Sequence, residues 1–282
     1  MAGPTIRRRR LGTDLRRLRE ARSLKLDEVA EHLGVAPSTL SRIETGKAPT
    51  RTSYLSVMLD LYGVQDADQR RMLLDLAREG QRKGWWSSAD DLLPAGAGTY
   101  LGLEAEADQV LAFGAQVLHG LIQTPGYARA VIAAGRPDLA AEDAGRLADV
   151  QLRRQQVRGA AGLRLHLVLD ESVLHRVLGS RVVMAEQLTS LAAAAGDGWL
   201  TVQVLPLAGV RTVLTPSFGI LRFTEAADPD LACVPGLPGQ VLLEYRAPQV
   251  RALIATFGAL ASAAIGPAES LTLIRDLAGQ YR

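Results

Sequence analysis

One short segment combines helix-boundary residues with a set of hydroxyl and arginine side chains at helical spacing. Residues 34–50 are GVAPSTLSRIETGKAPT. Gly34 ends an apolar-periodic run, and Pro37 stands where the first turn of a new helix needs no N–H. Leu40 and Ile43 are three residues apart and so face inward together. The outward face then carries Ser38, Thr39, Ser41 and Arg42. Short hydroxyls and an arginine are suited to bonding with phosphates and with base edges in a groove.

The rest of the chain offers few groups for catalysis. Its lysines are Lys25, Lys47 and Lys83, so no later residue can supply the lysine of a phosphate-binding loop, a Schiff base or a phospholipase D-type His-x-Lys site. Neither a G-x-S-x-G elbow nor a full G-x-G-x-x-G is present. Cys233, in LACVPGLPG, has no histidine near it in the sequence. We therefore expect no catalytic residues and no cofactor.

The histidines offer one conceivable metal site. His166 lies in the alternating segment LRLHLVLD, and Asp170, Glu171 and His175 follow it. A strand leading into a turn does not present two histidines as the i, i+4 face of an H-E-x-x-H helix does. Ordinary core or loop roles explain these residues better, so we expect no metal.

Length and composition indicate a globular chain that can bury a core. The chain has 282 residues, of which 48% are hydrophobic and 22% charged, and this length suggests two domains. No run approaches the ~18 apolar residues of a membrane span. MAGPTIRRRR has the charge of a signal peptide but no apolar region follows it. These features predict a cytoplasmic protein without a membrane segment.

Charge is divided unequally along the chain. Residues 1–84 carry 17 basic and 11 acidic side chains, whereas residues 85–282 carry 15 and 19. The first part is therefore net positive and the second net negative. Such asymmetry suggests that the N-terminal part faces nucleic acid, although a basic solvated surface would show the same count.

Apolar periodicity predicts an all-helical N-terminal domain over 1–83. Its expected helices cover 11–22, 26–33, 37–44, 53–62 and 66–83. Lys25 stands at the cap of the second helix, where threonine would be better. The segment 84–98, GWWSSADDLLPAGAG, is a linker containing the domain boundary, but Trp85 and Trp86 are too apolar to be free in solution.

Residues 99–282 are expected to form a second, mixed α/β domain. Expected strands cover 163–170, 200–207, 218–223 and 241–246, and expected helices cover 100–118, 124–135, 138–158, 182–195, 248–263 and 268–280. Strands that alternate with helices imply layered α/β architecture. The whole chain is thus predicted to be an α+β multidomain protein.

From about Leu11 to Leu61 the sequence resembles the XRE (lambda/434 repressor-like) helix-turn-helix family, most specifically in S-x-L-S-R-I-E-T-G. The resemblance implies a DNA-binding domain whose helix from Pro37 enters the major groove, with Ser38, Thr39, Ser41 and Arg42 at base edges. For Arg42, a phosphate contact or a pair with Glu44 is the alternative. The resemblance also implies backbone contacts, which we assign to Arg10, Lys25, Lys47, Thr50 and Arg51. Leu26 replaces the glutamine that often holds a phosphate in this family.

The remaining sequence resembles actinobacterial XRE regulators of the Scr/WhiJ-like antitoxin type. The segments that carry this resemblance are GWW, YLGLEAEA, LHGLIQTPGYARAV, LTVQVLPLAG and PSFGILRF. His119 replaces a proline that is usual before Gly120. The resemblance implies a transcriptional regulator, often encoded beside a small partner protein, with no established catalysis or ligand.

Three roles for the second domain stay open at this point. Trp85, Trp86, Tyr100 and Tyr127 can line a small-molecule pocket or form interdomain contacts. A small cognate protein is the alternative partner, in an antitoxin-like role, and an enzyme with a helix-turn-helix appendage is the third possibility. Double-stranded DNA is the expected partner of the first domain, bound by a homodimer.

Overall fold

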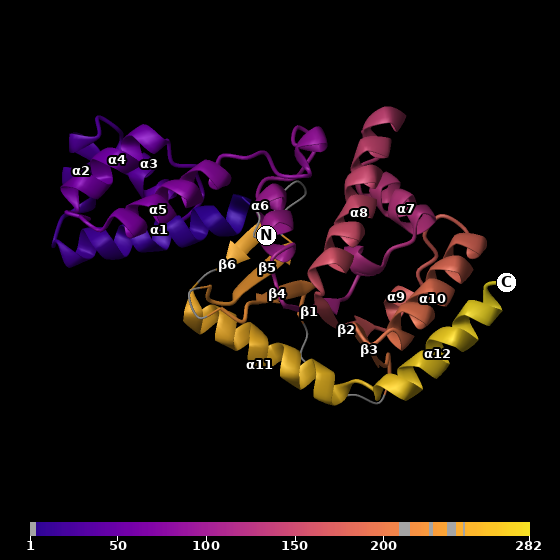
Figure 1. Cartoon of the computed structure of the whole chain (residues 1–282). Coiled ribbons are helices and arrows are strands. Elements are labelled where there is room, and N and C mark those ends of the chain that lie inside the picture. The colour runs from indigo at the N-terminus through magenta and orange to yellow at the C-terminus, as the bar shows by residue number, and fades with distance from the viewer. Residues whose placement is uncertain (1–3, 209–214, 226–227, 236–240, 245) are drawn as a thin grey trace. The chain divides into compact units, whose positions relative to one another are not determined.

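The computed structural model describes residues 4–208, 215–225, 228–235, 241–244 and 246–282. The chain divides into two compact units, Met1–Ser87 and Ser88–Arg282. Both are drawn in Figure 1. The division falls within the segment 84–98 that the sequence predicts to be a linker.

The first unit is helical. Its described residues form α1 (Pro4–Ala21), α2 (Leu26–His32), α3 (Pro37–Glu44), α4 (Thr52–Leu61) and α5 (Ala67–Gly80). The core is made of fully buried side chains from these helices, which include Leu15, Val29, Leu40, Leu55 and Leu73. The apolar periodicity therefore located each helix, although α1 begins seven residues before the predicted start.

Local capping explains where two of these helices begin. Lys25 precedes α2, and the backbone N–H of Lys25 donates a hydrogen bond to the Glu28 carboxylate at 2.8 Å. Glu28 thus supplies the reciprocal half of a capping box that a threonine would have completed. Asp66 precedes α5 and accepts from the Gln69 N–H at 2.6 Å.

The second unit contains a mixed sheet. Its described strands are β1 (Gln109–Gly114), β2 (Arg164–Asp170), β3 (Leu200–Leu205), β4 (Phe218–Arg222), β5 (Leu231–Pro235) and β6 (Val241–Glu244), in the order β3-β2-β1-β4-β5-β6. β1, β2 and β3 are parallel, whereas β4, β5 and β6 form antiparallel pairs. β1 is therefore the strand at which the two halves of the sheet join.

Helices cover both faces of this sheet (Figure 1). α11 (Ala247–Ala263) lies across one face, where Val250, Phe257 and Leu260 are buried against β1, β2, β4 and β5. α6 (Ala97–Glu104), α7 (Pro125–Gly135) and α8 (Ala141–Ala161) lie on the other face.

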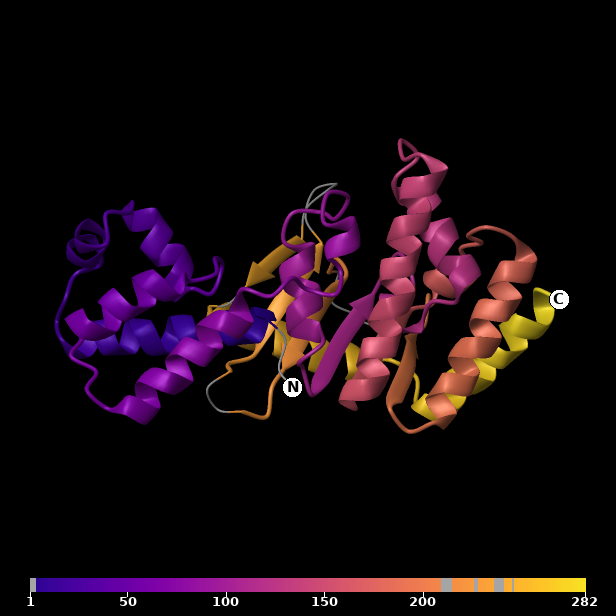
Figure 2. The same cartoon turned by 45° about the horizontal axis from the view of Figure 1, so that its top comes forward.

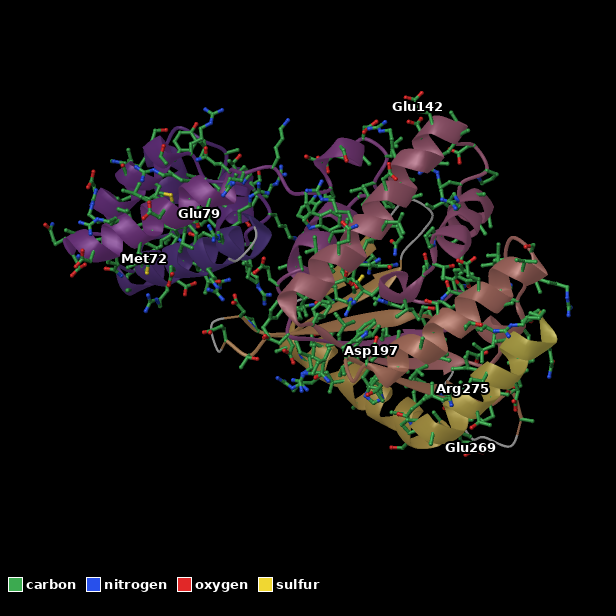
Figure 3. The ribbon with its side chains drawn as sticks, turned by 45° about the vertical axis from the view of Figure 1, so that its right-hand side comes forward. Met72, Glu79, Glu142, Asp197, Glu269 and Arg275 are labelled. Atoms are coloured by element: carbon green, nitrogen blue, oxygen red, sulfur yellow. The ribbon has the colours of Figure 1, made fainter. Side chains whose placement is uncertain are left out.

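The remaining helices lie near β3. The short α9 (Ser172–His175) follows β2, and α10 (Arg181–Gly196) packs beside α12 (Pro267–Gln280), as Figure 2 also shows. Glu142 and Glu269, labelled in Figure 3, lie in the first turns of α8 and α12, where the helix dipole stabilises a carboxylate.

The α+β fold class is confirmed, but two element predictions were wrong. The expected helix over 100–118 is instead α6 followed by β1, and the strand β5 was missed. The other expected elements are present within a few residues of their predicted ends. Tyr245, within the expected strand 241–246, lies outside the described residues.

No single helix among the described residues is long and apolar enough to cross a membrane. α11 and α12 meet that test only when taken together, with a bend of 70° between them.

Candidate DNA-contacting helix and ligand cavity

The helix α3 presents its predicted base-contacting residues outward. Leu40 and Ile43 are buried, whereas Ser38, Ser41 and Arg42 are exposed and Thr39 is half-buried. Gly34, in the turn before α3, has a φ of +64°, a conformation that favours glycine. The face that the spacing predicted to be polar is therefore accessible.

A buried ion pair holds the end of α3 against α1. The Nε and Nη2 of Arg19 donate to the two carboxylate oxygens of Glu44 at 2.7 and 2.9 Å, and Nη1 donates to the Leu24 carbonyl. Glu44 is therefore the partner of Arg19 and not of Arg42, the alternative that the sequence left open. Arg42 has no salt-bridge partner in the described part of the chain, so its guanidinium is available.

The predicted phosphate-contacting residues differ in accessibility. Lys25, Lys47 and Arg51 are exposed, and the Arg51 guanidinium lies 5.7 Å from the centre of the Tyr54 ring. Arg10 is half-buried. Thr50 is only 3% exposed, and its carbonyl accepts a hydrogen bond from Gln81 at 2.9 Å. The Thr50 side chain is thus the least available of this set.

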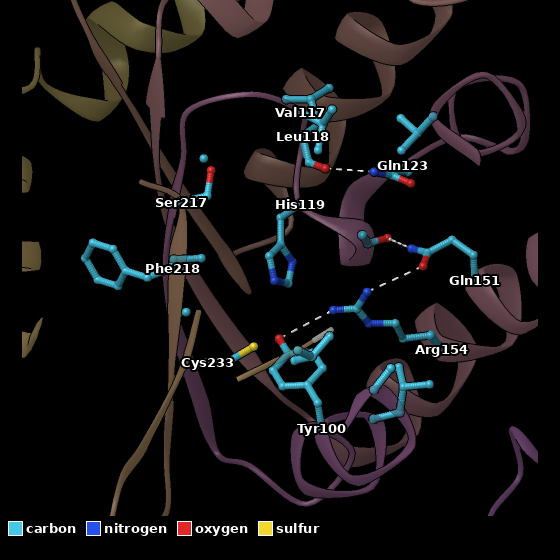
Figure 4. Close-up of a pocket in the computed structure, with 18 of the residues that line it drawn as sticks. Tyr100, Val117, Leu118, His119, Gln123, Gln151, Arg154, Ser217, Phe218 and Cys233 are labelled. Carbon is cyan, nitrogen blue, oxygen red and sulfur yellow. Dashed lines mark hydrogen bonds between the residues drawn. The ribbon is translucent and has the colours of Figure 1, made fainter. Parts of the chain in front are cut away.

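A cavity of about 400 Å³ lies in the second unit, between the sheet and the helices α6, α7 and α8 (Figure 4). Its floor is a row of small residues across three adjacent strands. Ala112 on β1 pairs with Gly219 on β4, and Gly219 pairs with Cys233 on β5. A Cβ at Gly219 would have the Tyr100 hydroxyl as its closest neighbour, 3.9 Å away. Small side chains at these positions leave the cavity open.

The walls of the cavity are mostly apolar. Leu93, Leu101, Leu118, Val131, Ile132, Leu147, Val150 and Val241 are among the lining residues. Phe218 also borders the cavity, but its ring points away from it in Figure 4 and packs in the core beneath α11.

A buried polar cluster occupies one side of the cavity. Arg154 donates from Nη2 to Glu104 Oε1 at 2.6 Å and from Nε to the other carboxylate oxygen, and the Tyr100 hydroxyl donates to Oε1 at 2.6 Å. Glu104 is 2% exposed. Burial alone would raise the pKa of Glu104, but the charge and hydrogen bonds of Arg154 hold it below its usual value. The pair is therefore ionised on both sides.

His119 points into the space bounded by Tyr100, Arg154 and Cys233 (Figure 4). Burial, reinforced by the charge of Arg154, lowers the pKa of His119 to about 4, so its ring is neutral at pH 7. Nδ1 accepts from the Leu121 N–H at 3.4 Å. The single ring proton is then on Nε2, which lies 3.9 Å from Glu104 Oε1, beyond hydrogen-bond range.

Comparison with protein families identifies both units. Residues 10–73 match the model of a helix-turn-helix domain, and residues 97–276 match the model of a domain of unknown function, DUF5753. The second match covers more than half of the chain. The chain belongs to the DUF5753 family. The match begins at the first residue of α6 and includes nearly all the residues that line the cavity. No curated protein and no solved structure matches the chain.

The DUF5753 domain brings together residues that sequence reasoning treated separately. The sequence placed no histidine near Cys233, yet His119 borders the same cavity. Burial raises the pKa of the Cys233 thiol to about 12, so it remains protonated and a poor nucleophile at neutral pH. No group of His, Cys, Asp and Glu residues in the described part of the chain is arranged to hold a metal. His166, one of the weighed ligands, instead bonds to Gln203 at 2.9 Å.

The four aromatic residues predicted to share a pocket or interdomain contact are placed differently from one another. Tyr100 lines the cavity of the DUF5753 domain. Tyr127 is fully buried in the same unit, beside the cavity lining, with its hydroxyl accepting from the Leu118 N–H at 3.4 Å. Trp85 and Trp86 belong to the first unit and pack edge to face, with ring centroids 5.5 Å apart.

Acidification should destabilise the DUF5753 domain through His119. The neutral ring is retained in the folded unit down to about pH 4, whereas the unfolded chain takes up this proton near pH 6.5. Stability that is present above pH 6.5 is therefore lost as the pH falls toward 4, by about 3 kcal/mol for such a shift. Calorimetric unfolding of the full chain across this range should show the loss, and His119→Gln should reduce it. An equal pH dependence in both proteins would contradict this role.

Proposed function

We propose that this protein is a sequence-specific transcriptional regulator that reads the major groove of DNA with α3. The observation that carries the proposal is the outward polar face of α3 within a helix-turn-helix domain. Ser38, Thr39, Ser41 and Arg42 are the proposed base contacts. Arg42 can donate two hydrogen bonds to the O6 and N7 of a guanine.

Basic side chains around α3 would hold the DNA backbone. We assign this role to Lys25, Lys47 and Arg51, which are exposed, and to Arg10. Thr50 would reach a phosphate only through a rearrangement, because its side chain is buried. Phosphate contacts of this kind set the position of the helix in the groove and do not read sequence.

We further propose that the protein acts in the cytoplasm as a homodimer controlled by the DUF5753 domain. Each protomer would supply one DNA-binding head, its helix-turn-helix domain. Two heads that bind half-sites about one helical turn apart, or a multiple of it, would double the few base contacts of a single α3. A ligand or a protein partner on the second unit would alter the spacing of the heads or their release. Such coupling is reciprocal, so DNA should change the affinity for that effector equally.

Selection of binding sites from fragmented genomic DNA by the purified full chain tests the regulator directly. The expected result is an enriched two-fold-symmetric motif whose half-site spacing gives the separation of the heads. Retention of DNA without any enriched sequence, under conditions where the chain is folded, would refute sequence-specific reading.

Arg42→Ala should weaken binding to the selected site by about 5- to 150-fold, which corresponds to roughly 1–3 kcal/mol for a bidentate base contact. Binding to unrelated DNA should change little, because base contacts contribute only to the specific complex. Equilibrium titrations at fixed salt measure both. Arg71→Ala is the matched control, since Arg71 is an exposed arginine of α5 paired with Asp68. An equal loss on both DNAs would make Arg42 a phosphate contact.

A further inference from the structure

We infer that the cavity of the DUF5753 domain binds an uncharged, mainly apolar small molecule whose carbonyl-type oxygen accepts hydrogen bonds from His119 and Arg154. This inference deepens the control by a ligand proposed above, and it depends on the proposed function only for its regulatory meaning. Four observations lead to it: the volume, the lining, the charge balance and the direction of the free hydrogen-bond donors.

The volume and lining define the body of the ligand. Benzene fills an apolar cavity of about 150 Å³, so a cavity of about 400 Å³ takes roughly 16 non-hydrogen atoms at the same ratio. Aliphatic side chains from α6, α7, α8 and β6 make up most of the wall. An apolar molecule of this size would bury nearly all of its surface in the cavity, and the transfer of that surface from water would contribute favourably to the binding free energy.

The charge balance excludes a strongly charged ligand. Arg154 is neutralised by Glu104 through two hydrogen bonds, and the Tyr100 phenol, the Cys233 thiol and the His119 ring are uncharged at neutral pH. A ligand carboxylate would lie beside the buried Glu104, and the described lining residues include no unpaired cation to compensate it. A ligand ammonium would meet Arg154. Either charge would lose its hydration without gaining a partner.

The orientation of donors selects an acceptor on the ligand. The Nε2–H of His119 faces the cavity without a hydrogen-bond acceptor among the described residues. Apart from its two bonds to Glu104, the Arg154 guanidinium makes only long bonds to the described residues, from Nη1 to Gln151 at 3.4 Å and from Nη2 to Tyr100 at 3.5 Å. A single carbonyl oxygen between these two groups would accept from both. The cavity thus combines a large apolar space with a few convergent donors, as small-molecule sites do.

Fluorescence titration of the full chain with three dyes of about the inferred size tests this assignment. Prodan is an uncharged naphthyl ketone, phenylnaphthylamine is uncharged but has no carbonyl, and anilinonaphthalene sulfonate is anionic. We expect saturable binding of prodan at one site per chain and at least tenfold weaker binding of the sulfonate. The absence of saturable prodan binding, or equal affinity for the sulfonate, would overturn the inference.

Two kinds of variant locate the dye. Gly219→Val should fill the floor of the cavity and weaken prodan at least tenfold, whereas Gly258→Ala, on an exposed position of α11 with open space around it, should leave its affinity unchanged. Cys233→Val fills the cavity floor from the neighbouring strand β5, and it serves as the test variant if Gly219→Val does not fold. His119→Leu should weaken the affinity for prodan about three- to tenfold, which is the effect of one hydrogen bond, and should leave the affinity for phenylnaphthylamine unchanged. Parental prodan affinity in the filled variants would place the dye elsewhere.

The two proposals fail separately. If the variants weaken prodan binding as expected but the chain enriches no DNA sequence, the ligand inference is supported and the proposed sequence-specific regulator is refuted. An enriched DNA motif without prodan binding would keep the regulator and refute this ligand class.

Discussion

DNA affinity should fall by about ten-thousandfold when the salt concentration rises from 50 to 200 mM, if two heads bind together. Arg10, Lys25, Lys47 and Arg51 provide four cationic groups per head for phosphates, and each neutralised phosphate contributes about −0.9 to the slope of log affinity against log salt. A dimer should therefore show a slope of about −7 and a single head about −3.6. Fluorescence anisotropy with the selected site across a salt series measures this slope.

Variants distinguish these contacts from the general charge of the first unit. Lys47→Gln with Arg51→Gln should reduce the magnitude of the slope by about two per head. Arg16→Gln with Arg17→Gln removes two exposed arginines of α1 that pair with Glu20 and Asp14, and it should leave the slope nearly unchanged. Equal effects of the two double variants would mean that DNA responds to overall charge and not to the loop after α3.

Glu104→Ala should destabilise the DUF5753 domain by about 3–5 kcal/mol. The substitution leaves the buried Arg154 guanidinium without its carboxylate, which costs more than the original pair contributes. Hydrogen exchange of the β1 and β2 amides in the full chain reports the opening of this unit specifically. Tyr100→Phe is the matched control, because it removes one hydrogen bond to the same carboxylate and should cost only about 1 kcal/mol.

A double substitution separates burial of charge from packing. Glu104→Leu with Arg154→Met removes both charges and should recover much of the stability that Glu104→Ala loses. A double variant as unstable as Glu104→Ala would show that the surrounding side chains, rather than the unpaired guanidinium, cause the loss.

The first unit was predictable because its information is local. Leu40 and Ile43 of α3 fall at helical spacing, and Gly34, Pro37 and Asp66 are turn or cap residues whose preference depends on one backbone conformation. The predictions for these helices needed no knowledge of distant contacts.

β1 was not predictable by the same means. After Gln109 its sequence VLAFG is a continuous run without polar side chains that is buried on both faces, and such a run does not show the alternation of a half-exposed strand. The alanines and leucines before it favoured the prediction of one long helix that continues through this segment. β5 is short and ends at Pro235 in a glycine- and proline-rich segment, so its strand pattern is weak.

The candidate cavity depends on pairing that sequence periodicity does not specify. Ala112, Gly219 and Cys233 become neighbours only through strand register, and Tyr100 and His119 approach Arg154 only when α8 lies on the sheet. Two sequence features mark the site only once the structure is known. Glu104 is a charged residue at the end of the apolar segment YLGL, and Gly219 lies within an apolar strand.

The row of small residues on the cavity floor makes ligand preference a property of a few positions. Enlarging Ala112, Gly219 or Cys233 would shorten or close the space without changing the ladder hydrogen bonds, since each lies within a regular strand. Divergence among relatives could then retune the recognised molecule by single substitutions while the scaffold stays fixed. The side-chain sizes at these three positions in aligned family members would predict which members have an open, a narrowed or a closed cavity before any ligand is known.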